Sequence, residues 1–127
     1  MRIVNNCEVA ICDTDKTKSG RIYPLQVMQD MVAEVNRVRM PVLGQFSGST
    51  TSSVDLDKVT HQVSNIRIED NKVIGDVTLL DTPHGITMQS LYDSDCNLRC
   101  CIRGSGYVDA GGVVSDFELL AIDIEMC

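Results

Sequence analysis

Residues 59–80 constrain the fold most strongly, because they have the pattern of two strands joined by a tight turn. Val59–Glu69 is rich in Val and Ile, and residues 73–80 have a similar composition. Asp70 and Asn71 lie between the two segments, and both residue types are typical of turns. An antiparallel hairpin is therefore the predicted centre of the fold, and the other elements must pack against one of its faces.

Strict alternation along the first strand of this hairpin divides its side chains between two faces. Val59, His61 and Val63 fall on one face, and Ile66 and Ile68 fall on the other. His61 lies in mid-strand, so two explanations stay open for it. It is either a half-buried imidazole whose nitrogens are bonded by neighbours, or a general base.

Two helices are predicted from capping signals and periodicity. Pro24 suits the first turn of a helix over Leu25–Val38, in which apolar residues recur at three- and four-residue steps. Pro41 ends that helix. A second, shorter helix begins at the Thr82-Pro83 pair and reaches Tyr92.

The remaining segments are predicted strands and loops. We expect strands over residues 2–11 and 97–102, and a pair of strand segments within residues 113–126. Residues 44–53 are rich in Gly, Ser and Thr and predict a loop. Residues 104–106 predict a break in the chain's regular structure, because they include two glycines.

Length and charge limit the class of protein. The chain has 127 residues, which is enough for one domain, so we expect a single domain over residues 1–127. It has 11 Lys and Arg against 18 Asp and Glu, a formal charge of −7, and no basic cluster for nucleic acid. No apolar run approaches the ~20 residues of a membrane span. We therefore predict an α+β protein, mainly an antiparallel sheet or barrel with two or more flanking helices, that binds neither nucleic acid nor membrane.

Six cysteines are many for a chain of this size. No pair has the spacing of a zinc knuckle, and no export signal suggests a disulfide framework. We expect reduced thiols, no metal site and no cofactor. The six are Cys7, Cys12, Cys96, Cys100, Cys101 and Cys127.

A few residues have the chemistry of a catalytic site. A thiol of the Cys100-Cys101 pair near Arg103 is either a buried inert cysteine or a candidate nucleophile, because a cation lowers a thiol pKa, and glycine N–H groups nearby can bind an oxyanion. Asp123 interrupts an apolar strand, so its carboxylate needs a partner such as an imidazole or Arg103. Asp81 is a second candidate to orient an imidazole, although capping of the next helix is the ordinary role for it. The other histidine, His84, has the position of an exposed residue at a helix start.

The order and spacing of several motifs resemble those of a known family. In chain order they are SGRIYPLQVM, VLGQF, KVTHQV, VIGDVTLLDTPHG, CIRGSGYV and FELLAIDIE, spanning residues 19–125. This pattern resembles the tailed-phage prohead proteases, which share a fold with the herpesvirus assemblins. The resemblance implies an assemblin-like fold and a serine-type endopeptidase that cleaves scaffold protein, capsid protein and its own chain.

The resemblance also implies roles for single residues. The family histidine falls on His61, the family serine falls on Cys101, and the oxyanion-binding segment falls on Arg103 and Gly104. Asp123 takes the acidic position of the last strand and would orient the imidazole. The implied partners are phage scaffold and capsid proteins, and the implied location is the prohead in the host cytoplasm.

A second hypothesis stays open beside the peptidase. Cysteine replaces serine at the nucleophile position, Ile102 replaces a small hydroxyl residue, and residues 45–49 replace the segment that leads to a His-Pro pair in the family. The chain would then be a catalytically inactive virion component that keeps the protease fold and binds scaffold. The sequence leaves homo-oligomer formation and self-processing undecided.

Overall fold

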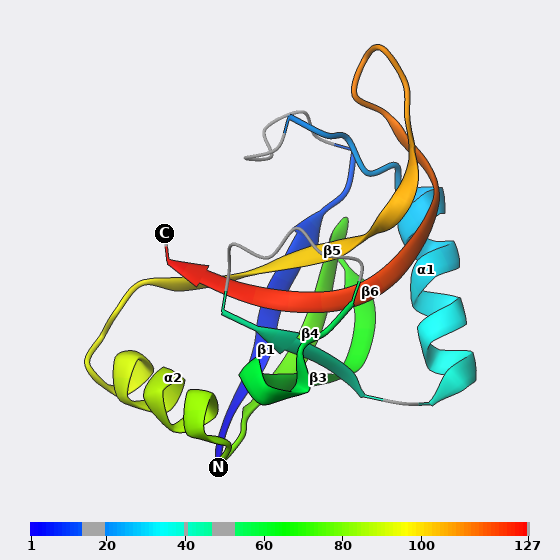
Figure 1. The fold of residues 1–127 in the computed structure, drawn as a ribbon. Helices are drawn as coiled ribbons and strands as arrows, with labels where there is room; N and C mark the ends of the chain where they lie inside the picture. The colour runs from blue at the N-terminus through cyan, green and yellow to red at the C-terminus, as the bar shows by residue number, and fades with distance from the viewer. Residues whose placement is uncertain (14–19, 40, 47–52, 127) are drawn as a thin grey trace.

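The structure is a computed structural model that describes residues 1–13, 20–39, 41–46 and 53–126 (Figure 1). These residues form an α+β fold in which the strands pair antiparallel and two α-helices flank them, as predicted. The helices are α1 (Leu25–Val38) and α2 (Pro83–Asp93), with a short 3-10 turn, η1 (Leu56–Lys58). The strands are β1 (Arg2–Ile11), β2 (Val42–Gln45), β3 (Val59–Glu69), β4 (Lys72–Leu79), β5 (Leu98–Val108) and β6 (Val114–Met126).

Two sheets make up the body of the fold. The first has the order β1-β4-β3-β2, and the predicted β3–β4 hairpin lies at its centre. The second is the β5–β6 hairpin, which crosses the first sheet in Figure 1. An isolated parallel bridge between Phe46 and Ile124 joins β6 to the end of β2. The last strand therefore lies directly on the edge of the first sheet.

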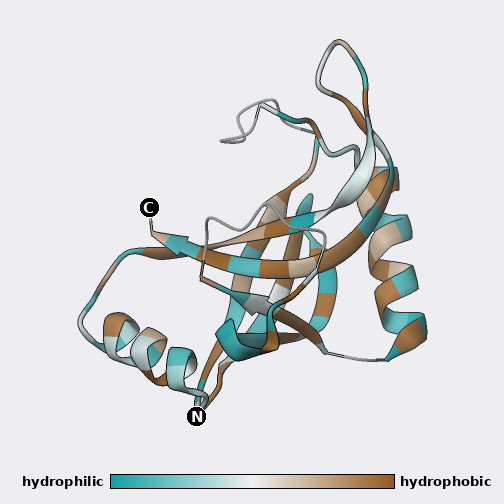
Figure 2. Ribbon diagram, viewed as in Figure 1, coloured by the Kyte–Doolittle hydropathy of each residue, from teal (hydrophilic) through white to brown (hydrophobic). Residues whose placement is uncertain are grey.

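The core fills the space between the two sheets and α1. Figure 2 shows hydrophobic residues recurring along the strands and alternating with polar ones on α1. Met28 and Met31 of α1 are almost fully buried, together with Val63 of β3 and Ile122 of β6. The apolar stripe of α1 was predicted from its three- and four-residue spacing, and the buried methionines confirm it.

A bulge changes which side chains of β3 face the core. The register of β3 against β4 shifts between Ser64 and Arg67, and Asn65 has a left-handed φ of 52°. The extra residue brings Ile66 back to the buried side, where it is only 3% exposed. The prediction that Ile66 faces away from Val63 was therefore wrong, because strict alternation does not hold across a bulge.

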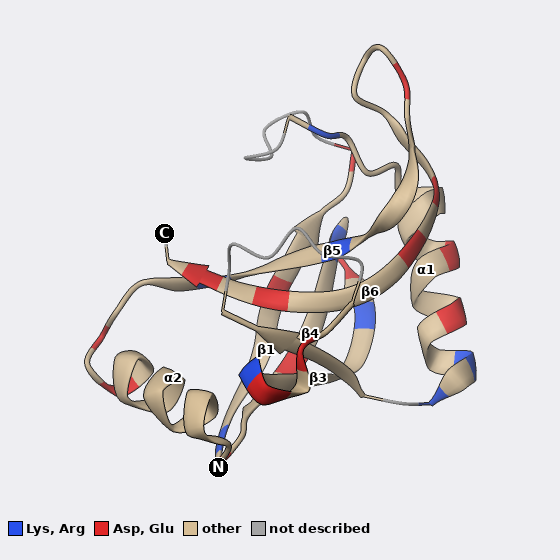
Figure 3. Cartoon of the chain, viewed as in Figure 1, with Lys and Arg blue, Asp and Glu red and all other residues tan. Residues whose placement is uncertain are grey.

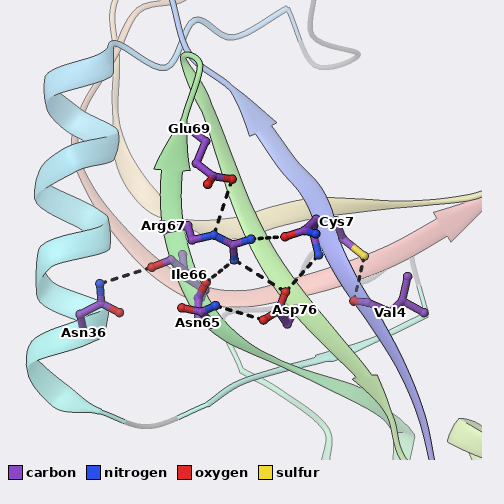
Figure 4. Close-up of polar contacts among 9 residues, drawn as sticks. Val4, Cys7, Asn36, Asn65, Ile66, Arg67, Glu69 and Asp76 are labelled. Atoms are coloured by element: carbon purple, nitrogen blue, oxygen red, sulfur yellow. Dashed lines mark hydrogen bonds and ion pairs between the residues drawn. The ribbon is translucent and has the colours of Figure 1, made fainter.

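A polar cluster on the outer face holds this bulge and one in β1 (Figure 4). The Asp76 carboxylate accepts hydrogen bonds from the backbone N–H of Asn6 at 3.0 Å and from Asn65 Nδ2 at 3.1 Å. Arg67 donates to the Asn6 side chain and to the Asn65 carbonyl. These hydrogen bonds, the one from Asn6 foremost, keep the pKa of Asp76 below its ordinary value.

Charged side chains outside this cluster are interspersed in sign. Figure 3 shows Lys and Arg distributed over several elements, with Asp and Glu between them. Several form exposed ion pairs, such as Arg2 with Asp93 at 2.9 Å and Lys72 with Glu8 at 3.4 Å. Exposed pairs of this kind contribute little to stability.

Three further segments differ from the prediction. β2 is a short strand that includes Gly44 and Gln45, where a loop was expected, because it pairs with β3. β6 is one continuous strand and not two segments. β5 continues through the expected break at residues 104–106, because it stays paired with β6 there. A Cβ at Gly104 would lie 2.1 Å from the Glu118 carbonyl oxygen. The glycine there permits the close approach of β6 and does not end the strand.

We predict that Gly104→Ala destabilises the fold by about 1–3 kcal/mol, because the added methyl group overpacks the β5–β6 interface. The matched control is Gly111→Ala in the hairpin turn, whose Cβ would meet nothing closer than Asp109 Oδ1 at 3.4 Å. Urea unfolding monitored by circular dichroism measures the free energy of unfolding of both variants. Equal stability of the two variants would contradict the close approach.

Candidate functional site

The predicted site residues come from three separate strands and meet around one short stretch of β6. Cys101 of β5 is the cross-strand partner of Asp123, so the two side chains share a face of the β5–β6 hairpin. His61 of β3 contacts the carbonyl of Ile122, the residue that precedes Asp123. Positions separated by 22 to 62 residues in the sequence therefore lie around residues 122–123.

His61 is fully buried, and both of its ring nitrogens are hydrogen-bonded. Nδ1 lies 2.5 Å from Thr60 Oγ1, and Nε2 lies 2.6 Å from the Ile122 carbonyl oxygen. A carbonyl oxygen only accepts hydrogen bonds, so Nε2 must carry the proton and donate it. Nδ1 then accepts from the Thr60 hydroxyl, and the neutral imidazole is bonded on both sides.

Gly44 makes this contact between strands feasible. It is the cross-strand partner of His61 in β2. A Cβ at this position would lie 1.8 Å from the Ile122 carbonyl oxygen and 2.5 Å from His61 Nε2. Any side chain would therefore push β6 away from the imidazole.

The surroundings of His61 lower its pKa. Burial is the main cause, because the charged imidazolium loses its hydration. The hydrogen bond to Ile122 and the negative charge of Asp123 act in the opposite direction and favour the imidazolium. Asp123 therefore influences His61 through its charge and not through a hydrogen bond to the ring.

The Asp123 carboxylate is bound by other groups. Arg103 Nε donates to Oδ2 at 2.8 Å and its Nη2 donates to Oδ1 at 3.2 Å, in a pair that is almost completely buried. The backbone N–H of Gln45 also donates to Oδ1, at 3.2 Å. Arg103 Nη1 donates further to the Ser53 carbonyl at 2.8 Å. Asp123 thus connects β6 with β2 and β5.

The alternative carboxylate, Asp81, lies elsewhere. It accepts hydrogen bonds from the Met1 amino group at 2.9 Å and from Gln89 Nε2 at 3.0 Å. The prediction that Asp81 caps α2 was wrong, because the Thr82 hydroxyl accepts the Gly85 N–H at 2.9 Å and is the cap. His84, in the first turn of α2, is exposed as expected.

Cys101 is half-buried and lines a cavity of about 740 Å³ between β1 and β5. Cys7 and Cys100 line the same cavity. Burial raises the pKa of Cys100 to about 12 and also raises the pKa of Cys7. Both neighbours of Cys101 therefore stay protonated at neutral pH, and neither is suited to nucleophilic attack.

The two residues predicted to bind an oxyanion are placed differently from each other. The guanidinium of Arg103 is engaged by Asp123 and Ser53. Gly104 lies opposite Leu119 in the β5–β6 ladder, and its main chain is close to Glu118. Oxyanion binding by this segment would therefore use main-chain N–H groups and not the Arg103 side chain.

Sequence reasoning missed three contributors to the site: the Thr60 hydroxyl, the Ile122 carbonyl and the absence of a side chain at Gly44. Adjacent residues of a strand normally face opposite sides, so nothing in the pattern indicates that Thr60 reaches the ring of His61. A backbone carbonyl has no signature in a sequence. The one available signal was a glycine that follows two apolar residues and precedes Gln45 and Phe46, because a glycine within a strand is typical of a close approach between backbones.

Neither a metal cluster nor a membrane-spanning helix is found within the described ranges. No group of three His, Cys, Asp or Glu side chains there is arranged to hold a metal ion. No helix among these residues has the length and apolar character needed to cross a membrane.

Comparison with solved structures shows that this fold has been seen before. The capsid assembly protease of bacteriophage T4 superposes with a TM-score of 0.80 at 14% sequence identity, over 100% of this chain and 92% of that one. No protein-family model and no curated protein matches the chain. At 14% identity the likeness establishes the fold alone. The sequence resemblance to phage head proteases agrees with this fold.

The buried His61 predicts a pH-dependent stability. Its folded pKa lies below the unfolded value of ~6.5, so the unfolded chain takes up the proton first and stability falls as pH decreases below ~6.5. The loss approaches ~1.4 kcal/mol per pH unit until the folded pKa is reached. Above pH ~6.5 this contribution is complete.

The measurement is urea unfolding between pH 5 and 8 for the wild type, His61→Gln and His84→Gln. In His61→Gln, most of the dependence of the unfolding free energy on pH should disappear between pH 5 and 6.5. The control His84→Gln, which changes an exposed residue, should keep this dependence. A wild-type slope in His61→Gln would show that other groups cause the dependence.

The raised pKa values of three thiols predict that they alkylate slowly. Cys7, Cys12 and Cys100 should react slowly with iodoacetamide at pH 7, since burial raises the pKa of all three, and the candidate nucleophile Cys101 should be labelled before them. Peptide mass mapping at short times measures the order. Fastest labelling at Cys100 would contradict the assignment of the reactive thiol.

Proposed function

We propose that the chain is an endopeptidase of phage head maturation with Cys101 as nucleophile and His61 as base. The observation that carries the proposal is the meeting of Cys101, His61 and Asp123 around residues 122–123, in a fold shared with a capsid assembly protease. These are the same three positions to which the sequence resemblance assigns the catalytic roles. Buried titratable groups that converge from different strands are typical of active sites.

The proposed reaction is acyl transfer through a thioester. In the tautomer of His61 that carries its proton on Nδ1, Nε2 accepts the proton of Cys101, and the sulfur attacks the carbonyl carbon of the scissile peptide bond. Main-chain N–H groups of the segment at Arg103 and Gly104 would hold the oxyanion. The imidazolium returns the proton to the leaving amine, and a water activated by His61 then hydrolyses the thioester to a carboxylate and the free thiol.

In this reaction Asp123 acts through its electrostatic field. Its charge favours the imidazolium form of His61, which is the form that appears after the nucleophile has lost its proton. The hydrogen bond to Nδ1 comes from Thr60 and not from a carboxylate. The Cys–His–Asp assignment is thus kept, with a modified role for the acid.

The substrate would be an extended segment of scaffold or capsid protein. In the described part of the chain, β5 pairs only with β6 and β1 pairs only with β4, so each leaves one edge without a ladder partner. Both edges border the cavity that Cys101 lines. An unpaired strand edge binds extended peptides through main-chain hydrogen bonds, and the apolar cavity would accept a side chain. The proposed place of action is the prohead in the host cytoplasm.

A second candidate function is a catalytically inactive virion component that keeps the protease fold and binds scaffold. A specific observation favours it: His61 uses both ring nitrogens, and the Asp123 charge is paired with Arg103. A histidine whose two ring nitrogens are both hydrogen-bonded is suited to a structural role. Cysteine at the nucleophile position is compatible with either function.

Co-expression with the scaffold and capsid proteins of the same phage tests the proposal. Wild type should cleave at least one of them, whereas Cys101→Ala and His61→Ala should reduce cleavage by at least ~10²-fold, the lower end of what general acid–base catalysis contributes. Cys96→Ala is the matched control, because Cys96 is also a partly buried free thiol but lies outside the cavity.

Each other outcome is informative. Cleavage that survives Cys101→Ala would exclude the proposed nucleophile, and cleavage lost only in Cys100→Ala would move it by one position. Absence of cleavage together with stable binding of the wild type to scaffold would favour the inactive component.

A further inference from the structure

The hydrogen bond between His61 and Ile122 has a consequence for the proposed peptidase, on which this inference rests. A general base at Nε2 needs a lone pair on that nitrogen. In the structure Nε2 carries a proton and donates it to the Ile122 carbonyl at 2.6 Å. We propose that this contact is an autoinhibitory latch, and that the structure holds the enzyme in a latent state.

Thr60 allows the ring to leave this state without a change of charge. A hydroxyl both donates and accepts hydrogen bonds, so Thr60 can serve either neutral tautomer of the imidazole. In the latent tautomer it donates to Nδ1, as the 2.5 Å contact requires. In the active tautomer the proton moves from Nε2 to Nδ1, the Nδ1–H donates to Thr60 Oγ1, and the Nε2 lone pair becomes available to Cys101. Thr60 is therefore a positioning residue for both states.

The latch lies beside a second bond to β6. His61 of β3 binds the Ile122 carbonyl, and the Gln45 N–H of β2 donates to Asp123 at 3.2 Å, so two successive residues of β6 are held. Arg103 binds Asp123 from the opposite strand and reaches the Ser53 carbonyl. Withdrawal of residues 122–123 from β2 and β3 breaks the latch and the bond from Gln45 to Asp123 in one movement.

The alternative explanation is that the histidine only supports the structure. A structural histidine needs a hydrogen-bond partner for each ring nitrogen. It gains nothing from a partner that can change from donor to acceptor. Valine is isosteric with threonine and lacks the hydroxyl, whereas serine keeps it. The pair Thr60→Val and Thr60→Ser therefore separates a tautomer switch from a packing role.

The first test is ¹⁵N NMR of the full chain labelled at histidine, with His84→Gln used to assign His61. At pH 8 we expect a protonated Nε2 and an unprotonated Nδ1 for His61 in the free protein. A proton on Nδ1, or a mixture like that of free imidazole, overturns the latch. This readout does not depend on whether the chain cleaves anything.

The second test compares kcat and KM on the cleaved head protein, or on a peptide that spans its cleavage site. Thr60→Val should lower kcat by at least ~10-fold with little change in KM, because the active tautomer loses the acceptor for Nδ1–H, and Thr60→Ser should restore it. Thr78→Val on β4 is the control for loss of a strand hydroxyl. Unchanged kcat in Thr60→Val overturns the positioning role.

The two proposals fail in different ways. An Nδ1–H tautomer in a protein whose cleavage depends on Cys101 and His61 would remove the latch and leave the peptidase. An Nε2–H tautomer in a protein that cleaves nothing, with or without Thr60, would remove both the peptidase and the latch as a regulatory device, and His61 would be a structural link between β3 and β6.

Discussion

The attachment of β6 to the first sheet is the interaction on which the rest of the structure depends. It consists of the parallel bridge between Phe46 and Ile124, the hydrogen bond from His61 to Ile122 and the contacts of Asp123. The side chains of His61 and Asp123 are buried, and a buried polar group without a partner costs ~1–3 kcal/mol or more. The groups are therefore interdependent: removal of one leaves another unsatisfied. The same attachment brings residues of β3 and β5 to one place.

Two glycines make such close approaches between strands feasible. Gly44 lets the Ile122 carbonyl reach the imidazole, and Gly104 lets β6 approach β5 at Glu118. In both places the space that a Cβ would fill is occupied by a carbonyl oxygen of β6. The fold thus uses the absence of side chains to position its last strand, and it does so on both sides of the candidate site.

Much of the secondary structure could be predicted, because it follows from local rules. β1, α1 and β3 have the predicted bounds, since alternation, apolar stripes and proline positions act over a few neighbouring residues. The errors occurred where a distant strand overrides the local preference. β2 forms because β3 and β6 pair with its polar, glycine-containing end, and β5 passes through its glycines because β6 lies against them.

The sequence by itself determined the α+β class, the helices and the hairpin, and it singled out Cys101, His61, Arg103 and Asp123 as residues with unusual chemistry for their positions. Only the tertiary structure decided how these residues are connected. In it, Asp123 forms an ion pair with Arg103, and His61 is hydrogen-bonded to the Thr60 hydroxyl and to a backbone carbonyl. Cys101 lines a cavity. The physical reason is that hydrogen bonds and ion pairs depend on distances of about 3 Å between groups far apart in the chain. Periodicity and residue type do not encode such distances. The backbone carbonyl that binds His61 cannot be recognised from residue type either, because every residue has one.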